Sequence, residues 1–389
     1  MVLGNMKQKS VAMKDRPMRV LHVSKYFYPH DGGIESVCRD IIFALKSRPG
    51  TKQMCVCFGD DAKTFAERIY GIPVLRIAPF ATVRKQALSI KYYFILRKII
   101  NRFRPDVVHV HLPNMLICLY LLFIPKTFRL IIHWHSDIIE QKMLHFCFQG
   151  IEYLCLKRAD LILGTTERYI AGSAVLRKWR DKCKVCPNIV DPEKFDLRPG
   201  DEDAVAALRK KYVDPIVFFC GRHVKYKGLE LLIKAAGLVK NPCRFVIAGS
   251  GPLTEQLLRS EKSSNISFVG RLSDDELRQH LHAATIFAFP SITKNEAFGV
   301  SLAEGLSCGL PAVTFTIPGS GVNVVSVGGM TGVEVAVQTP QALAEGFDTL
   351  LSDRELCRRF SENAKKHIRE HFTKRILEKV IDEIYYGER

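Results

Sequence analysis

Two glutamates in the last third of the 389-residue chain are spaced so that both could bind one nucleotide. Glu296 lies in a polar loop after the apolar run 285–289, and Glu304 follows it by eight residues. The loop is expected to lead into a helix that begins near Phe298 or Gly299. Eight residues are about two helical turns, so both carboxylates can face the same ligand. Unpaired N–H groups at a helix start favour a phosphate, and a carboxylate behind that phosphate suits the hydroxyls of a ribose.

Two cations on an earlier loop have the chemistry of a diphosphate site. Arg222 and Lys227 lie between Gly221 and Gly228, directly after the predicted strand 216–220. An arginine can bind two phosphate oxygens at once, and a lysine adds a compact positive charge. Loop cations are commonly solvated, but the flanking glycines allow a ligand to approach the backbone closely. The loop therefore predicts binding of a diphosphate.

Two further glycine turns follow predicted strands. Gly249 and Gly251 come after the strand 244–248, at the edge where open α/β sheets bind their ligands. Gly32 and Gly33 separate the first predicted strand from the first helix, and alone they indicate only a tight turn. They are not a dinucleotide fingerprint, because G-x-G-x-x-G is absent after that strand.

Four histidines alternate along two predicted strands of the first half. His109 and His111 share one face of a strand, and His133 and His135 share one face of another. No Glu or Cys accompanies them at the spacing of metal ligands, so we expect them to line a cleft rather than to bind a metal. The D-x-D match at 201–203 precedes a helix, where acids are favoured, and does not indicate a metal site either.

In chain order these motifs resemble those of the retaining glycosyltransferases of family four, which have the GT-B fold. The matching elements are the two glutamates with seven residues between them, G-R-x-x-x-x-K-G at 221–228, the 249–251 turn, Y-P-H-D-G-G-I-E, and I-I-H-W-H-S-D-I. The resemblance implies two Rossmann-like α/β domains facing across a cleft. The first domain would bind the acceptor and the second a nucleoside-diphosphate sugar.

The resemblance also assigns roles to individual residues. It implies catalytic roles for His135, Glu296, Arg222 and Lys227. It implies substrate binding by a larger set: Gly32, Gly33, Arg222, Lys227, Gly249, Gly251, Glu296, Phe298, Gly299, Val300 and Glu304. No metal or cofactor is expected, because Arg222, Lys227 and the helix start near Phe298 would neutralise the leaving diphosphate.

The activity implied is a retaining hexosyltransferase that uses a saccharide or lipid-linked acceptor in polysaccharide biosynthesis. The segments H-W-H-S-D-I-I and G-S-G-V-N resemble bacterial surface-polysaccharide enzymes and favour mannose from GDP-mannose, with UDP-sugars as the alternative. A sugar-nucleotide epimerase shares the fold, but its acid and base residues are not identifiable here. A nucleic-acid-binding protein would explain the basic half without requiring Glu296 and Glu304 behind a phosphate site, so no nucleic acid is expected as a partner.

Charge is unevenly distributed along the chain. Residues 1–195 carry 32 Lys and Arg against 16 Asp and Glu, a net charge of +16, whereas residues 196–389 carry +1. A basic amphipathic stretch at 83–104 is expected to be helical, and it could lie on an anionic membrane or pack on the core with a solvated back. No signal peptide is recognisable, and the apolar run 115–124 is too short to span a bilayer. We therefore expect a cytoplasmic protein that is peripheral on the inner membrane.

The expected organisation has four parts. Residues 1–16 form a disordered tail, 17–195 the acceptor-binding domain and 196–371 the donor-binding domain. Residues 372–389 form a last helix that the resemblance brings back to the first domain.

Overall fold

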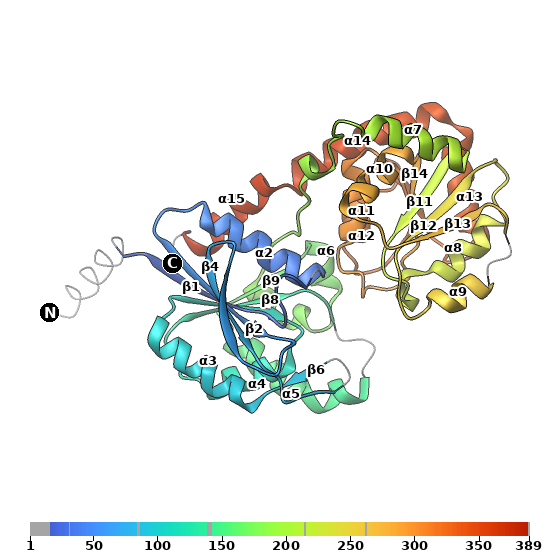
Figure 1. The fold of residues 1–389 in the computed structure, drawn as a ribbon. Helices are drawn as coiled ribbons and strands as arrows, with labels where there is room; N and C mark the ends of the chain where they lie inside the picture. Colours follow the sequence, from blue (N-terminus) through green and yellow to red (C-terminus); the bar gives the residue numbers. More distant parts are fainter. Residues whose placement is uncertain are drawn as a thin grey trace. The chain divides into compact units, whose positions relative to one another are not determined.

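The computed structural model describes residues 16–30, 32–83, 86–137, 142–213, 215–260 and 263–387, and these divide into two compact α/β units (Figure 1). The first unit comprises the described residues of Met1–Gly164, Lys178–Val185 and Glu378–Arg389. The second comprises those of Thr165–Arg177 and Cys186–Leu377. The expected tail over 1–16 lies outside the described residues except for Arg16, which pairs with Asp106.

The first unit is built on one eight-stranded sheet with the order β10-β9-β8-β7-β1-β2-β4-β3. Its neighbouring strands are parallel except for the antiparallel pair β3 and β4. The central strands are apolar and buried on both faces, as parallel strands covered by helices are. The strand bounds are β1 Met18–Val23, β2 Thr51–Phe58, β3 Phe65–Ile69, β4 Ile72–Ile77, β7 Val107–Leu112, β8 Arg129–Trp134, β9 Leu161–Gly164 and β10 Cys183–Val185.

Helices cover both faces of this sheet. The helices of the unit are α2 Gly33–Lys46, α3 Ile90–Phe103, α4 Met115–Phe123, α5 Lys142–Arg158 and most of α15 Lys374–Tyr385, with most of the 3-10 segment η1 Leu176–Lys182. Cys55 and Cys57 of β2 pack in one core cluster with Cys38 of α2. Tyr92 of α3 packs on Phe58 of the same strand, with ring centroids 4.7 Å apart. Since alternate residues of a strand point to opposite faces, α2 and α3 lie on opposite sides of the sheet.

The predicted helix over 83–104 is wrong in its first part. Strands β5 (Ala81–Val83) and β6 (Gln86–Leu88) form an antiparallel pair, and α3 begins only at Ile90. The physical reason is Ser89, which is extended and whose carbonyl accepts the first helical hydrogen bond, from Tyr92. Ser89 therefore caps the helix and ends the hairpin.

The last helix is fastened to the first unit at its end. The Arg48 guanidinium binds the Asp382 carboxylate through two hydrogen bonds, at 2.6 and 2.7 Å. The Tyr385 hydroxyl bonds to the buried His109 Nδ1. These contacts account for the placement of 378–387 with a unit that the chain left some 200 residues earlier.

The second unit has a six-stranded parallel sheet with the order β13-β12-β11-β14-β15-β16. Its strands are β11 Ile216–Cys220, β12 Arg244–Ala248, β13 Ile266–Gly270, β14 Ile286–Phe289, β15 Ala312–Phe315 and β16 Gly332–Val335. Its helices are α6 Glu167–Gly172, α7 Asp201–Tyr212, α8 Leu229–Ala236, α9 Thr254–Ser260, α10 Asp274–Ala283, α11 Val300–Ser307, α12 Val322–Val325, α13 Pro340–Ser352 and α14 Arg354–His371, with the 3-10 turns η2 Pro192–Phe195 and η3 Lys225–Lys227. The predicted architecture of two parallel-sheet α/β domains is confirmed.

The unit boundary differs from the one expected at residue 195. Residues 165–177 and 186–195 belong to the second unit because they pack on its loops. The Thr165 hydroxyl donates to the Ala297 carbonyl at 3.1 Å, and the amide of Val190 donates to the Phe372 carbonyl at 2.8 Å.

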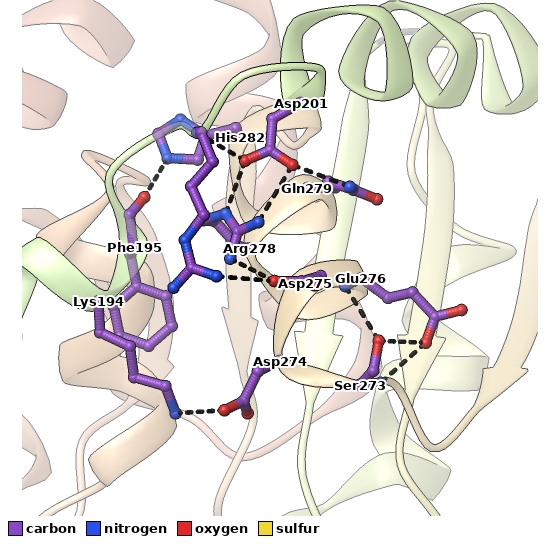
Figure 2. A network of polar contacts seen from close by, with 11 residues as sticks. Lys194, Phe195, Asp201, Ser273, Asp274, Asp275, Glu276, Arg278, Gln279 and His282 are labelled. Atoms are coloured by element: carbon purple, nitrogen blue, oxygen red, sulfur yellow. Dashed lines mark hydrogen bonds and ion pairs between the residues drawn. The ribbon is translucent and has the colours of Figure 1, made fainter.

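The D-x-D match at 201–203 has a structural role. Asp201 opens α7 and accepts hydrogen bonds from Arg278 at 2.7 Å and from Gln279 at 2.9 Å, which fasten α7 to α10 (Figure 2). The bond from Arg278 is the main reason that the pKa of Asp201 lies below its ordinary value. Ser273 and Glu276 form a capping box at the start of α10 in the same network. Both oxygens of Asp201 are thus engaged by these side chains.

In the described segments, no helix has both the length and the apolar character needed to cross a bilayer.

Candidate active site

An ion pair at the carboxyl edge of the second sheet brings together two predicted site residues. Lys227 ends the loop after β11, Glu296 lies in the loop after β14, and these two strands are neighbours. The Lys227 ammonium pairs with Glu296 Oε2, and the two side chains are only 9% and 11% exposed. The Phe289 ring lies 4.8 Å from Lys227 Nζ and forms the apolar floor of the pair. Sequence spacing could not show this pair, because its members are far apart in the chain.

Two serines hold the Glu296 loop. Ser291 Oγ donates to Glu296 Oε2 at 3.3 Å, and Ser320 Oγ donates to the Glu296 carbonyl. Both serines are fully buried. The sequence analysis did not identify them, and an isolated serine after a strand carries no signal that could have done so.

Arg222 differs from Lys227 in its environment. It is exposed, and among the described residues no hydrogen bond or ion pair engages its guanidinium. The loop therefore presents one cation held by a carboxylate and one cation open to an anionic ligand. Arg222, the open cation, can bind phosphate without first losing a protein partner.

Gly249 and Gly251 are required by loop packing. Gly249 has φ +118, and a Cβ there would clash with the Gly221 carbonyl oxygen. A Cβ on Gly251 would clash with the backbone of His223. The His223 amide donates to the Ser250 carbonyl at 3.1 Å and ties the two loops together. These glycines thus place the Arg222 loop, while their direct contact with a substrate stays a prediction.

A histidine and a threonine that the sequence analysis did not identify complete this junction. Thr254 Oγ1 accepts from the Gly251 amide at 2.8 Å and hydrogen-bonds His223 Nδ1 at 2.9 Å. His223 is buried, which lowers its pKa below the ordinary value. The neutral imidazole stabilises both glycine turns of the sheet edge.

Helix α11 begins where it was predicted. Gly299 is its N-cap, with φ +93, and Val300 is its first residue. The first amides of a helix have no intrahelical acceptor, so α11 offers them at the edge that carries Lys227 and Glu296. Glu304 lies one turn further along α11 and is half-buried.

The side chains of two residues at this helix start pack into the core. Phe298 is buried and packs edge-on against Phe372, with ring centroids 5.3 Å apart. Val300 packs against the same core. The Phe298 side chain is therefore buried in the core, and its predicted part in substrate binding stays a prediction that concerns its backbone.

In the first unit, the start of α2 leaves room at one of the two predicted glycines. Gly32 is the N-cap of α2, and a Cβ on it would clash with the Glu35 carboxylate. A Cβ on Gly33 would meet nothing within 4 Å. Asp31 lies outside the described residues. The open space at Gly33 suits the predicted approach of a ligand to the backbone.

The first sheet aligns five histidines on the face covered by α2. His22 of β1 lies opposite His109 of β7, and His111 lies opposite His133 of β8. His135, at the end of β8, shares a hydrogen bond of 3.0 Å between its Nε2 and His111 Nδ1. Parallel rings stack along the row, with the centroids of His133 and His135 4.3 Å apart. Sequence periodicity found four members of this row but not His22.

Burial keeps this row neutral. It lowers the pKa of His22 to about 4 and that of His133 to about 3. It holds the pKa values of His109, His111 and His135 well below the ordinary value, with a smaller contribution from neighbouring histidines. His135 is 7% exposed and its Nε2 is engaged by His111, so its Nδ1 is the atom left for a ligand.

A cysteine lies close to the histidines in space, although none stands at the spacing of metal ligands in the sequence. Cys38 of α2 reaches the row and lies with His22 and His111 such that one ligand atom of each is within 4.8 Å of the others. Spacing along the sequence could not reveal this, because the cysteine comes from a helix packed over the sheet.

Two family models match the chain. Residues 31–194 match the model described as Glycosyltransferase Family 4, and residues 201–367 match the model described as Glycosyl transferases group 1.

Two curated relatives align over nearly the whole chain. The O-antigen chain mannosyltransferase C of Escherichia coli is 30% identical over 365 residues, which cover 92% of this chain and 95% of that protein. The D-rhamnosyltransferase WbpZ of Pseudomonas aeruginosa is 28% identical, with 92% of each chain covered.

Solved structures share the fold at low identity. Sucrose-phosphate synthase from Thermosynechococcus elongatus superposes with a TM-score of 0.78 at 19% identity, over 95% of this chain and 98% of that one. HepE of Anabaena, in complex with UDP and glucose, superposes with a TM-score of 0.75 at 18% identity, over 95% of this chain and all of that one.

Proposed function

This chain belongs to glycosyltransferase family four and has the GT-B fold, and we propose that it moves a hexose from a nucleoside-diphosphate sugar to a saccharide or lipid-linked acceptor in O-antigen biosynthesis, with retention of anomeric configuration. The observation that carries the proposal is the buried pair of Lys227 and Glu296 beside the open cation Arg222, at the sheet edge where α11 begins. The full-length similarity to the Escherichia coli mannosyltransferase supports it.

Departure of the diphosphate is the step that these residues would assist. Arg222 and Lys227 supply positive charge where the leaving group gains negative charge, and the first amides of α11 add donors that need no reorganisation. Glu296 holds Lys227 in position through their ion pair. Glu304 would accept hydrogen bonds from the ribose hydroxyls. With this charge in place, the proposed reaction requires neither metal nor cofactor.

Retention is proposed to follow from attack on the face that the diphosphate leaves. In this mechanism the leaving phosphate takes the proton of the acceptor hydroxyl, so neither carboxylate forms a covalent intermediate. The fully buried Ser291 and the ion pair with Lys227 restrain Glu296 and suit a positioning role.

We propose mannose as the sugar and GDP-mannose as the donor. The name of the Escherichia coli relative supports mannose, whereas the rhamnosyltransferase of Pseudomonas aeruginosa and the UDP complex of HepE support other donors as alternatives. The test is a turnover screen of the purified full chain against GDP-, UDP- and dTDP-sugars, with the anomeric configuration of the product read by NMR. Turnover of GDP-mannose with retention is expected.

Two outcomes of that screen would contradict the proposal at different levels. Turnover of a UDP-sugar alone would exclude the proposed donor but keep the reaction. Absence of turnover, together with no rise in melting temperature on adding any nucleoside diphosphate, would exclude the donor site itself.

His135 is proposed to orient the transferred sugar. We expect His135→Ala to lower kcat by at least about ten-fold, the effect of roughly 1.4 kcal/mol in the transition state, with unchanged affinity for the nucleoside diphosphate. Steady-state kinetics and calorimetric titration measure the two quantities. The control is His133→Ala, two residues before it in the chain. A fall in melting temperature with normal kcat per folded molecule would make His135 purely structural.

The first unit is proposed to associate with an anionic membrane through α3. Tyr92, Leu96 and Ile100 bury one face of this helix in the core, and Phe94 remains 63% exposed among exposed lysines and arginines. Exposed apolar side chains among cations are typical of helices that lie in the bilayer interface. The proposed location is the cytoplasmic face of the inner membrane.

Flotation with anionic liposomes tests this association. Binding should fall as salt rises, because each Lys or Arg at the surface contributes about 1 kcal/mol that salt screens. The triple variant Lys91→Glu, Arg97→Glu, Lys98→Glu should lose binding, while Lys210→Glu with Lys211→Glu on α7 should keep it. Equal flotation of both variants, or none by the wild type at low salt, would contradict the membrane role of α3.

A further inference from the structure

We propose that the first unit binds a zinc-type divalent metal ion in its interior, between His22, Cys38 and His111. The three residues come from β1, α2 and β7 and are completely or almost completely buried. One ligand atom of each lies within 4.8 Å of the other two, so small side-chain movements bring them to the spacing of a shared ion. This site goes beyond the proposed reaction, which uses no metal.

The hydrogen bonds around His22 leave one of its nitrogens with a lone pair and no partner in the described structure. The Gln53 amide donates from its Nε2 to the Ile42 carbonyl at 3.0 Å, which turns its Oε1 toward His22 Nε2, also at 3.0 Å. An amide oxygen only accepts, so His22 carries its proton on Nε2 and a lone pair on Nδ1. That Nδ1 is buried and has no hydrogen-bond partner among the described residues.

His111 likewise has one nitrogen in a hydrogen bond and one nitrogen without a partner among the residues that the structure describes. Its Nδ1 is engaged by His135 at 3.0 Å, and its Nε2 is buried without a hydrogen-bond partner in the described part of the chain. A buried polar atom without a partner is costly, and native proteins rarely leave several together. A metal ion bound to His22 Nδ1 and His111 Nε2 would satisfy both atoms at once.

The ligand chemistry selects a borderline-soft ion. Imidazole nitrogen and thiolate sulfur are the ligands of structural zinc, whereas magnesium and calcium prefer oxygen. Cys38 is not in a disulfide, and a thiol that coordinates a metal gives up its proton and offsets part of the ionic charge. The Cys55 thiol is hydrogen-bonded to Cys38 and lies opposite His22 in the sheet register, which makes it the candidate for a fourth ligand.

A metal on His111 would act on His135 through their hydrogen bond. With its Nε2 bound to the ion, His111 can only donate from Nδ1, so His135 Nε2 must accept and its proton must lie on Nδ1. The metal would therefore fix which His135 atom can donate to a sugar. This consequence rests on the proposed function, whereas the metal site itself does not.

Metal content and cobalt spectra test the site directly. The full chain is purified without a histidine tag, analysed by mass spectrometry for bound metal, stripped with a chelator and titrated with Co²⁺. We expect one bound ion per chain, with visible bands of tetrahedral cobalt and a near-ultraviolet band from sulfur to cobalt. Cys38→Ala should lower the intensity of the sulfur band, with any remaining band coming from Cys55, and His22→Gln should abolish binding. Gln53→Leu should weaken binding by roughly 10–100-fold, because Gln53 orients a ligand.

The control is Cys118→Ala, which removes another buried, reduced cysteine of the same unit and should leave the cobalt spectrum unchanged. The melting temperature of each variant establishes that it folds. If the Cys38→Ala variant does not fold, the His22 and Gln53 variants decide the outcome. Absence of cobalt uptake by the wild type would overturn the proposal. So would binding without a sulfur band, or identical titrations of wild type, His22→Gln and Gln53→Leu.

Discussion

Arg222→Ala is expected to lower kcat roughly 100-fold while leaving the melting temperature unchanged. A charge-assisted contact that strengthens as the diphosphate leaves supplies about 3 kcal/mol of transition-state stabilisation. The guanidinium is exposed and unpaired among the described residues. Its removal is therefore not expected to lower the free energy of unfolding by a comparable amount. The measurement is steady-state turnover of a nucleoside-diphosphate sugar, and Lys225→Ala, an exposed cation of the same loop, is the matched control.

Lys227→Ala is expected to lower kcat by a similar factor and to reduce stability as well. Removal of the lysine leaves the Glu296 carboxylate buried without its cation, which is a costly state. The double variant Lys227→Ala, Glu296→Gln removes that unpaired charge, so it should recover the melting temperature without recovering kcat. Near-normal turnover of the Arg222 or the Lys227 variant would exclude the proposed diphosphate site.

Acid is expected to destabilise the metal-free first unit. Burial lowers the pKa of His22 to about 4 and of His133 to about 3, so below the ordinary value of 6.5 the unfolded chain binds protons that the folded chain does not. Stability is therefore complete above pH 6.5 and is lost as the pH falls toward the folded values. At pH 5 each of these two histidines lowers the free energy of unfolding by about 2 kcal/mol, or roughly 4 kcal/mol together.

The two tryptophans allow this unit to be followed alone. Trp134 and Trp179 are the only tryptophans of the chain, and both belong to the first unit. Urea unfolding is monitored by tryptophan fluorescence between pH 7.5 and 5, with a chelator present. His133→Leu, which removes an imidazole that has no hydrogen bond in the described structure, should reduce the loss of stability between pH 7.5 and 5 by about 2 kcal/mol, the share of His133. A free energy of unfolding that does not change over this range would contradict the prediction.

Local patterns in the sequence predicted much of the fold. Strands β11 and β12 and the start of α11 lie where apolar runs and glycine turns placed them. These elements are specified by residues close together in the chain, which is why periodicity and turn chemistry suffice. The hairpin at 81–88 was missed because its short strands carry no alternation distinct from a helix.

The candidate site was predictable in its membership but not in its contacts. Arg222, Lys227, Glu296 and Glu304 were found from spacing and from the family resemblance. The ion pair between Lys227 and Glu296 depends on the neighbouring positions of β11 and β14, and the contact of Cys38 with the histidines depends on how α2 packs. Both are long-range outcomes of sheet order and helix packing, which a single sequence does not display.

The return of α15 to the first unit determines when that unit can be completed during synthesis. Chains fold as they leave the ribosome, N-terminal parts first. Here the hydroxyl that bonds to the buried His109 belongs to Tyr385, 276 residues further along the chain. The sheet of the first unit emerges early, yet it lacks this partner and the Asp382 contact until α15 has been synthesised. A nascent or C-terminally truncated chain therefore holds an unfinished first unit, a natural substrate for chaperones and proteases.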